Sequence, residues 1–273
     1  MEYLDGLFGL SGRCALVTGG ATGIGRMIAE ALASAGARVL IASRKGEACV
    51  AAAEELNARG ARGTAEGFAG DVGSEEGVAA LAAEVRARTD RLDILVNNAG
   101  RTWGEPLDQF PFSAFEKVMS VNVAGLFTLT RDLLPLLEAA ASEEAPARVV
   151  NIGSVMGTRP LGDGAYSYAA SKAAVHHLTL ILAKELAGRR ITVNAIAPGP
   201  FASKMTAFVT ADASRRAIVE AAVPFGRLGA ADDLAGTVLY LCGRAGAYTT
   251  GAIIPLDGGM SVSTGHEVFG EQP

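Results

Sequence analysis

Cysteine and clustered charge are scarce in this 273-residue sequence. It has three cysteines, an odd number, and they lie far apart at Cys14, Cys49 and Cys242. That spacing provides neither a disulfide framework nor a metal-ligand motif, so we interpret them as buried or incidental thiols and expect no metal site. Charged residues make up 19% of the chain, the formal net charge is -5, and lysine and arginine are scattered. A nucleic-acid-binding protein would carry a basic patch, so we exclude that class of partner.

Long hydrophobic runs are lacking as well. No stretch approaches the ~20 consecutive apolar residues that a membrane-spanning helix needs. The first residues, MEYLDGLFGLSGR, lack the apolar segment of a secretory signal. We therefore expect no membrane association and a cytoplasmic location. The 49% hydrophobic content and the 34 glycines indicate a folded chain with a large core and many tight turns.

Short apolar runs alternate with longer alanine-rich runs along most of the chain. This alternation predicts parallel strands connected by crossover helices. The expected strands are Cys14–Thr18, Arg38–Ser43, Thr64–Gly70, Ile94–Asn97, Arg148–Ser154, Thr192–Ala197 and Ala252–Pro255. The expected helices are Ile24–Ala35, Gly46–Arg59, Glu75–Arg88, Ser113–Ala140, Tyr168–Ala187 and Asp232–Leu241, with a weaker one at Ser203–Ala222. The predicted fold class is α/β, a Rossmann-type doubly wound parallel sheet of about seven strands with helices on both faces.

The sequence gives no sign of a second domain. It has no internal repeat, no low-complexity tract and no shift in composition, and 273 residues suit one large α/β domain. We expect residues 1–273 to form a single dinucleotide-binding and catalytic domain with a core over about 12–260. An insertion on the substrate side is expected over about 200–225, where such segments often act as lids. A tail is expected from about Ser261.

A glycine-rich turn follows the first expected strand, reading Thr18-Gly19-Gly20-Ala21-Thr22-Gly23-Ile24-Gly25. Glycine lets the backbone turn sharply and approach a pyrophosphate, while the N–H groups at a helix N-terminus face the anion. A single glycine-rich turn can also be no more than a tight turn. Its position after the first strand of an alternating α/β pattern nevertheless favours a dinucleotide site.

The end of the second expected strand has no carboxylate. An NAD enzyme has Asp or Glu there, about 20 residues after the glycines, to bind the ribose 2′-hydroxyl. This chain has Ser43, Arg44 and Lys45 instead. Arginine attracts a 2′-phosphate and binds it through two parallel hydrogen bonds, so we predict NADP (NADPH) in preference to NAD. The alternative is that Arg44 and Lys45 are ordinary solvated surface charges.

Tyr168 and Lys172 stand four residues apart in an expected helix and so share one face. A free tyrosine titrates near 10, so acid–base work near neutral pH requires a neighbour that favours the phenolate, and a lysine ammonium does so. This spacing alone is common on helices without any function. Tyr166 has Ala170 in the corresponding position, so Tyr168 is the tyrosine that we assign to proton transfer.

Polar residues also follow two other expected strands. Ser154 ends the fifth strand, and Asn97-Asn98-Ala99-Gly100 closes the fourth. Open α/β sheets bind their ligands at the carboxyl ends of the strands. A hydroxyl of Ser154 can therefore donate to a substrate carbonyl there, and small residues allow a flat ring to approach. Asn122 falls in the helix that follows the fourth strand.

In combination and in this order, these motifs resemble the short-chain dehydrogenase/reductase family over nearly the whole chain, from Gly12 to about Met260. Further matches are Asp71-Val72, Pro198-Gly199 with Ser203, and Asp257-Gly258-Gly259. Many family members have threonine where this chain has Ser203, which retains the hydroxyl.

The resemblance implies the role of each site residue. Tyr168 is then the general acid/base, Lys172 binds the nicotinamide ribose and lowers the pKa of Tyr168, Ser154 polarises the carbonyl, and Asn122 holds a water in a proton relay. The implied cofactor contacts are Gly19, Thr22, Gly23, Ile24, Gly25, Ser43, Arg44, Lys45, Asp71, Val72, Asn98, Ala99, Gly100, Tyr168, Lys172, Pro198, Gly199, Phe201 and Ser203.

Within that family, less common stretches are similar to the β-ketoacyl reductases of rhamnolipid biosynthesis. They are Arg101–Gly104, Asn151–Val155, Pro200–Thr206 and Gly246–Gly251. This similarity implies NADPH-dependent reduction of a ketone to a secondary alcohol, with a 3-oxoacyl thioester of acyl carrier protein or coenzyme A as substrate.

The residues expected to flank the substrate favour an acyl chain over a sugar, because they are apolar, although apolar walls are common to ligand pockets in general. They are Val155, Met156, Leu161, Phe201, Met205 and Phe208. An NAD(P)-dependent secondary-alcohol, sugar or polyol dehydrogenase remains the alternative. A nucleotide-sensing or scaffolding protein without turnover is a third hypothesis, which the complete catalytic set argues against.

The remaining expectations concern assembly and isolated residues. The helices that contain Asn122 and Tyr168 are rich in alanine and leucine around much of their circumference, which predicts a homodimer or homotetramer. His176 and His177 have no partner at metal-ligand spacing, so we assign them packing or surface roles. Trp103 either stacks on substrate or packs beside the cleft.

Overall fold

The computed structural model describes residues 2–202 and 212–263 of the chain. Within them, seven strands form one parallel sheet in the order β3-β2-β1-β4-β5-β6-β7. The strands are β1 Cys14–Thr18, β2 Arg38–Ser43, β3 Thr64–Ala69, β4 Ile94–Asn97, β5 Ala147–Ile152, β6 Ile191–Pro198 and β7 Ile253–Leu256. The strand order reverses between β1 and β4, and open α/β sheets bind ligands at such a reversal.

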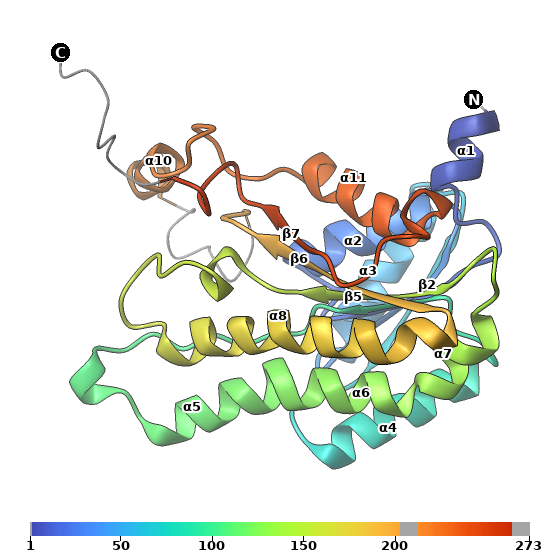
Figure 1. The fold of residues 1–273 in the computed structure, drawn as a ribbon, viewed down its shortest axis with the longest axis horizontal. Coiled ribbons are helices and arrows are strands. Elements are labelled where there is room, and N and C mark those ends of the chain that lie inside the picture. Colours follow the sequence, from blue (N-terminus) through green and yellow to red (C-terminus); the bar gives the residue numbers. More distant parts are fainter. Residues whose placement is uncertain (1, 203–211, 264–273) are drawn as a thin grey trace.

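Helices cover both faces of the sheet, with α2, α3 and α11 on one side and α4, α6 and α8 on the other (Figure 1). The helices are α1 Glu2–Phe8, α2 Gly23–Ser34, α3 Gly46–Ala58, α4 Glu75–Arg88, α5 Phe112–Met119, α6 Leu126–Asp132, α7 Leu134–Ala140, α8 Tyr166–Leu186, α10 Ala213–Ala221 and α11 Ala231–Cys242. Shorter turns are η1 Leu107–Gln109, η2 Ser120–Gly125, η3 Val155–Gly157, η4 Ala187–Arg189 and η5 Arg244–Gly246. The predicted doubly wound fold is confirmed.

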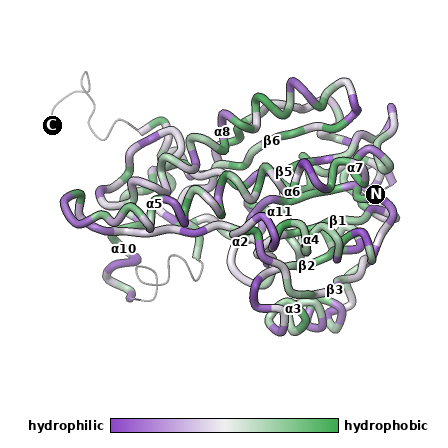
Figure 2. The backbone as a smooth tube through the Cα atoms, turned by 90° about the horizontal axis from the view of Figure 1, so that it is seen from below, coloured by the Kyte–Doolittle hydropathy of each residue, from purple (hydrophilic) through white to green (hydrophobic). Residues whose placement is uncertain are grey.

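The two helical layers create two hydrophobic cores, one on each face of the sheet. In β1, Ala15 and Val17 pack in the core of α2 and α11, whereas Leu16 between them packs in the core of α4 and α8. Successive strand residues point to opposite faces, so a strand covered on both faces is apolar throughout. Figure 2 shows the hydrophobic residues along β6 and along much of α8.

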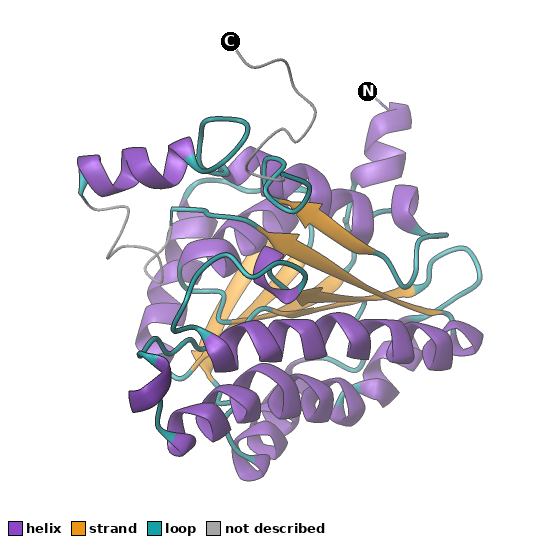
Figure 3. Cartoon of the chain, turned by 60° about the vertical axis from the view of Figure 1, so that its left-hand side comes forward, coloured by secondary structure: helices purple, strands orange, loops and turns teal. Residues whose placement is uncertain are grey.

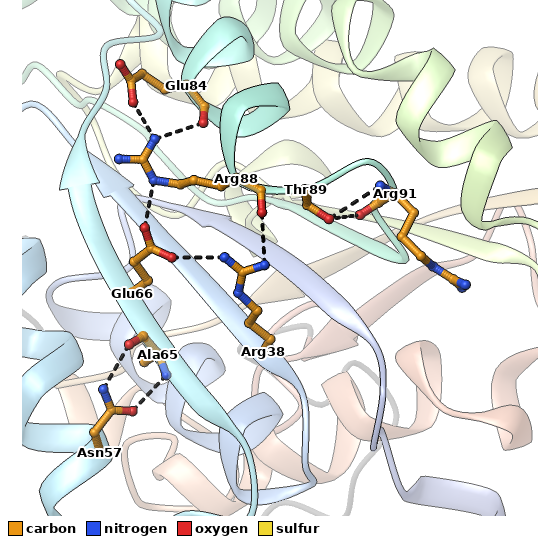
Figure 4. Close-up of polar contacts among 8 residues, drawn as sticks. All are labelled: Arg38, Asn57, Ala65, Glu66, Glu84, Arg88, Thr89 and Arg91. Carbon is orange, nitrogen blue, oxygen red and sulfur yellow. Dashed lines mark hydrogen bonds and ion pairs between the residues drawn. The ribbon is translucent and has the colours of Figure 1, made fainter.

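Polar side chains close the β3 edge of the sheet (Figure 4). Glu66 of β3 accepts hydrogen bonds from Arg38 of β2 at 3.0 Å and from Arg88 of α4 at 2.8 Å. Asn57 of α3 bonds both the carbonyl and the N–H of Ala65, at 2.9 and 2.8 Å. Exposed ion pairs contribute only ~0.2–1 kcal/mol each. The main consequence is that the N–H and carbonyl of Ala65 on this edge strand, which would otherwise be open to pairing with another chain, are occupied.

All seven predicted strands are present, with bounds that shift by two residues at most. The single helix predicted over Ser113–Ala140 is wrong. In its place α5 leads into the π-helical turn η2, followed by α6 and α7. Gly125 has no room for a Cβ against the carbonyl of Val72, and Pro135 in the first turn of α7 breaks the helical hydrogen bonding between α6 and α7.

Two other parts of the chain differ from the expectation. The helix α1 was not predicted, and its residues are largely exposed. Of the weak helix predicted over Ser203–Ala222, α10 covers the final part, and residues 203–211 lie outside the described chain. In the part that the structure describes, no helix is long and apolar enough to cross a membrane.

The carboxyl ends of the strands meet on one side of the molecule. Figure 3 shows the strand arrowheads directed toward the side that carries α10. The loops that follow β1, β2, β4, β5 and β6 therefore converge there, and each of them contains residues that the sequence motifs identified.

Candidate active site

One cavity of about 410 Å³ lies at these strand ends, within the range of ~300–1,000 Å³ that is typical of small-molecule sites. Of the predicted catalytic and cofactor-binding residues, Ser203 lies outside the described chain and Asn122 does not line the cavity. All the others line it. Residues that are far apart in the sequence are thus brought into a single site.

The glycine turn between β1 and α2 is closed against the end of β4. Gly19 and Gly23 have positive φ angles of 66° and 56°, which glycine adopts without strain. A Cβ on Gly19 would come within 2.9 Å of Asn98 Nδ2, and Gly25 has no space for one against the same amide. Thr18 Oγ1 accepts hydrogen bonds from the N–H groups of Asn98 and Ala99, both at 3.0 Å. The glycines are therefore required by the neighbouring strand as well as by any ligand.

The start of α2 is suited to an anion. The helix begins at Gly23, and the N-cap residue Thr22 makes no side-chain cap hydrogen bond. The first N–H groups of the helix thus lack a side-chain acceptor, and they lie beside the cavity that Thr22, Gly23 and Ile24 line. A helix N-terminus of this kind favours a phosphate.

Cations outnumber carboxylates around the cavity. Its described lining includes Arg44, Lys45, Arg101 and Lys172, against one carboxylate, Asp71. Arg44 and Lys45 are exposed directly after β2, where their charges can meet a ligand without first breaking buried contacts. This balance fits a molecule with several phosphate groups.

Lys172 is buried between α8 and β5. Its side chain is 5% exposed, and its ammonium donates a hydrogen bond to the carbonyl of Ile152 at 2.7 Å. Burial disfavours the charged form and lowers the pKa of Lys172 to about 8. The ammonium lies 5.6 Å from the centroid of the Tyr168 ring, so the helical spacing does bring the pair together.

The expectation that Lys172 lowers the pKa of Tyr168 is not met. Burial raises the pKa of the phenol above its ordinary value of 10.0, and a hydrogen bond with the Ser154 side chain offsets only part of that change. The ammonium of Lys172 bonds the Ile152 carbonyl rather than the phenol oxygen. Tyr168 therefore holds its proton at neutral pH, as a proton donor must.

Ser154 begins the turn η3 instead of ending a strand, because β5 stops at Ile152. Its hydroxyl accepts a hydrogen bond from the N–H of Met156 at 3.2 Å. Because the oxygen is the acceptor in this bond, the hydroxyl hydrogen remains able to donate. Ser154 thus supplies a donor beside the Tyr168 phenol in the cavity wall.

Asn122 lies behind the cavity in η2, where its side chain connects two segments. Oδ1 accepts a hydrogen bond from the N–H of Arg101 at 2.7 Å, and Nδ2 donates to the carbonyl of Arg101 and to Ser171 Oγ, both at 2.9 Å. Ser171 in turn donates to the carbonyl of Tyr168 at 2.7 Å. The side chain therefore fixes the loop after β4 to α8, and a water held by Asn122 stays a prediction.

The sequence analysis missed a row of buried polar side chains that are hydrogen-bonded to one another across the sheet. Asn97 Nδ2 donates to Thr130 Oγ1 and to Asn151 Oδ1, and Asn151 Nδ2 donates to Thr179 Oγ1, each at 3.0 Å. This polar row crosses from α6 through β4 and β5 to α8. Two asparagines inside otherwise apolar strands, at paired positions in the sheet, are the signal that could have revealed it.

Of the residues predicted to flank the substrate, Phe201 lines the cavity, whereas Val155, Met156 and Leu161 do not. Val155 and Phe201 are buried, at 4% and 2% exposure, while Leu161 is 40% exposed. Met205 and Phe208 lie outside the described chain. Tyr166 packs edge-on against the ring of Phe110 at 5.5 Å.

Other groups that could carry chemistry are isolated. In residues 2–202 and 212–263, no three His, Cys, Asp or Glu side chains are grouped so as to hold a metal ion. Cys14, Cys49 and Cys242 are all free and buried. His177 is exposed and His176 is buried beside Ser154.

Comparison with known proteins agrees with this geometry. The short chain dehydrogenase family model matches residues 13–214. A Pseudomonas aeruginosa protein described as a rhamnolipids biosynthesis 3-oxoacyl-(acyl-carrier-protein) reductase is 49% identical over 253 residues, which cover 93% of this chain and 98% of that protein. Galactitol 2-dehydrogenase (L-tagatose-forming) of Cereibacter sphaeroides is 38% identical, covering 96% of this chain and all of that protein, 100%.

A solved structure shows the same fold. The Pseudomonas aeruginosa RhlG/NADP active-site complex superimposes with a TM-score of 0.91 at 48% identity, covering 94% of this chain and 99% of that one. The family match extends over most of the chain, and the glycine turn, Ser154, Tyr168 and Lys172 lie together in one cavity. This protein therefore belongs to the short-chain dehydrogenase family of oxidoreductases.

Proposed function

We propose that this protein is an NADPH-dependent reductase that converts a ketone to a secondary alcohol, with a 3-oxoacyl thioester as substrate. One observation carries the proposal. Ser154, Tyr168 and Lys172 line the same cavity as the glycine turn and the cations after β2. A hydride donor bound along that cavity and a carbonyl beside Tyr168 would then be within reach of each other.

The residues of the cavity fit a phosphorylated dinucleotide. The N-terminus of α2 would hold the pyrophosphate, and Arg44 with Lys45 would hold the 2′-phosphate through charge-assisted hydrogen bonds. Asn98, Ala99 and Gly100 would border the nicotinamide. The similar RhlG/NADP complex supports NADP in preference to NAD. When bound, NADPH supplies the hydride that the protein itself lacks.

Residues of this chain would polarise the substrate carbonyl and donate the proton. The hydroxyl of Ser154 donates a hydrogen bond to the substrate carbonyl oxygen, which draws electron density away from the carbon. The Tyr168 phenol then transfers its proton to that oxygen, so that the carbonyl becomes a hydroxyl while its carbon gains the hydride. Lys172 would bind the nicotinamide ribose beside Tyr168, and Asn122 keeps the surrounding segments in place.

The thioester is supported by the rhamnolipid-biosynthesis reductase, which is 49% identical over nearly its whole length. Acyl carrier protein or coenzyme A would present the acyl chain, and residues 1–273 would act as one catalytic domain. A second candidate is a secondary-alcohol, sugar or polyol dehydrogenase. It is supported by the 38% identical galactitol 2-dehydrogenase. In this second function the protein would oxidise a polar alcohol to a ketone.

Steady-state assays separate the two candidates. NADPH oxidation is followed with 3-oxoacyl thioesters of several chain lengths, on coenzyme A and on acyl carrier protein, and with cyclic ketones. NADP reduction is followed with galactitol and other polyols. We expect the highest kcat/KM for a 3-oxoacyl thioester. A higher kcat/KM for a polyol would overturn the proposal of a thioester substrate and support a polyol dehydrogenase.

We also propose that the protein assembles as a homodimer or homotetramer. Large apolar side chains are exposed on α5, α6 and α8, including Phe112 at 78%, Phe127 at 41% and Ile181 at 47%. Burial of such side chains between subunits would stabilise an assembly. Light scattering at micromolar concentration tests this proposal, and a monomer at that concentration contradicts it.

A further inference from the structure

His176 is a buried side chain that the proposed mechanism does not use. It lies on α8, one helical turn beyond Lys172 and two beyond Tyr168, and it is 7% exposed. Its neighbour His177 is exposed. Of these two adjacent histidines, His176 is therefore the one that packs against Ser154 and the turn η3 that follows it.

The segment that carries Ser154 wraps around the His176 imidazole. The ring fills the space beside Gly153, where a Cβ would overlap Nε2, and beside Gly157, where a Cβ would come within 2.6 Å of Cε1. Glycines on both sides of Ser154 thus allow close contact with the ring. Any displacement of the ring would therefore displace the backbone of Ser154 as well.

A hydrogen bond joins the imidazole to the catalytic serine. The N–H of Ser154 donates to His176 Nε2 at 3.4 Å. A neutral imidazole that accepts at Nε2 has its proton on Nδ1, and Nδ1 has no partner among the described residues. An apolar side chain of similar size would remove the unpaired Nδ1 donor, but it would leave the buried N–H of Ser154 without its acceptor. Packing alone therefore does not account for a histidine here.

The electrostatic surroundings keep this ring neutral. Burial, and then the charge of Lys172, lower the pKa of His176 below its ordinary value of 6.5. The turns η2 and η3 and the strand β6, which pack against α8, have no charged side chain, and α5, which also packs there, carries Glu116 and Lys117, both exposed. Lys172 is thus the charged group that acts on the ring from the described elements around it, and it disfavours the imidazolium.

We propose that His176 is a positioning residue, whose neutral imidazole holds the Gly153–Gly157 segment so that the Ser154 hydroxyl meets the Tyr168 phenol and the substrate carbonyl. The inference rests on the proposed roles of Ser154 and Tyr168. Protonation of His176 removes the acceptor for the Ser154 N–H, so the ring holds the segment only while it is neutral.

Three variants test this role through turnover. His176→Leu removes the acceptor, and kcat is expected to fall by ~10²-fold, because small displacements of catalytic groups have effects of that size. His176→Gln retains an acceptor oxygen at the position of Nε2, so most of the activity should return. His177→Leu is the matched control, and an exposed change of this kind should alter kcat by about twofold at most. The KM for NADPH should change little in all three.

The pH profile separates positioning from packing. Reduction uses protonated Tyr168 and charged Lys172, so falling pH removes neither. With NADPH and ketone both saturating, the wild-type kcat should nevertheless fall at pH values below 6.5, as His176 gains a proton. His176→Gln should lack this decrease. An equal decrease in both proteins overturns the inference, and this comparison does not require that His176→Leu folds.

Hydrogen exchange supplies a readout that is independent of turnover. Mass spectrometry of a peptide covering residues 153–157 should show faster amide exchange in His176→Leu than in wild type, and unchanged exchange in His177→Leu. If amide exchange in His176→Leu is as slow as in wild type, the inference is overturned even if kcat falls. A wild type that reduces no ketone overturns the proposed function instead, and the exchange data still decide whether His176 holds the segment.

Discussion

The two ends of the cavity are constructed in different ways. At the end where we propose that the nucleotide binds, the nucleotide end, Arg44 and Lys45 are exposed residues that directly follow a strand. At the end where we propose catalysis, the catalytic end, Lys172 in the wall and Asn122 behind it are buried, at 5% and 2% exposure, and each is hydrogen-bonded to a segment distant in the sequence. Residues at the nucleotide end can each contact a ligand independently. Residues at the catalytic end depend on hydrogen bonds to other segments for their positions.

This difference predicts how substitutions combine. Exposed side chains without shared partners have nearly additive effects, whereas buried residues of one hydrogen-bond network do not. Substitutions at the nucleotide end should therefore change cofactor affinity and little else. Substitutions at the catalytic end should change turnover and disturb their neighbours.

The largest effect is expected at Tyr168. Tyr168→Phe removes the phenolic oxygen and leaves the ring, so kcat for ketone reduction should fall by ~10²-fold or more, the usual contribution of general acid catalysis. NADPH binding, measured by fluorescence titration, should be retained. Tyr166→Phe is the control and should keep most activity, because Tyr166 has no lysine one turn away. Retained turnover in Tyr168→Phe would remove the proposed mechanism.

The next largest effect is expected at Arg44. If Arg44 binds the 2′-phosphate, Arg44→Ala should weaken NADPH binding by roughly 10- to 150-fold, while NADH affinity changes little. Ser43→Asp should shift the preference further toward NADH by repelling the phosphate. Arg59→Ala, a change at another exposed arginine, is the control. Titration of NADPH and NADH at low and high salt checks this prediction. Equal weakening of NADPH and NADH binding would show that Arg44 does not bind the 2′-phosphate.

A pH dependence is expected from Lys172. Its pKa is lowered to about 8, so its charge is present below that pH and is lost as the pH rises through it. At saturating substrates, kcat for reduction should fall up to ~10-fold per pH unit above pH 8, as expected for loss of one essential proton. Tyr168, with a raised pKa, would titrate later. A constant kcat up to pH 10 would show that the charge of Lys172 is not required.

The last expected effect is a coupling energy between two residues. Asn122→Ala and Ser171→Ala remove partners of one hydrogen bond, so their effects on kcat/KM should differ from additivity by ~0.5–3 kcal/mol. Asn122→Ala combined with Arg44→Ala should be additive within ~0.5 kcal/mol. Double-mutant cycles measure both values. Equal coupling in the two cycles would mean that the ends of the cavity are not constructed differently.

The fold could be predicted from sequence because its strands are buried on both faces. A parallel strand under two helical layers is a continuous apolar run, and all seven runs were found. The helix over Ser113–Ala140 could not be predicted correctly, because an alanine- and leucine-rich pattern does not distinguish an α-helix from a π-helical turn. The backbone carbonyl of Val72, against which Gly125 is packed, comes from a distant part of the sequence.

The site was predicted as a set of residues but not as a set of contacts. Parallel strands necessarily end at one edge of the sheet, so motifs at strand ends had to meet there. The partners of Asn122, at Arg101 and Ser171, are 21 and 49 residues away, and nothing in the sequence pairs them. The raised pKa of Tyr168 depends on burial, which a spacing of four residues does not reveal.

The order of the strands also has a consequence for synthesis of the chain. In the described sheet, β1 lies between β2 and β4, and it pairs with β4 through residues such as Ala15 and Ile94. Just beyond the end of β4, the N–H of Asn98 bonds the side chain of Thr18, which lies 80 positions earlier. At ~5–20 residues per second, a ribosome needs roughly 4 to 16 s to make the intervening chain. Throughout that interval the glycine turn lacks the amide of Asn98 that closes it, and β1 presents an open edge. Until β4 is made, this open edge of the nascent amino-terminal half can pair with another chain, which is a route to aggregation.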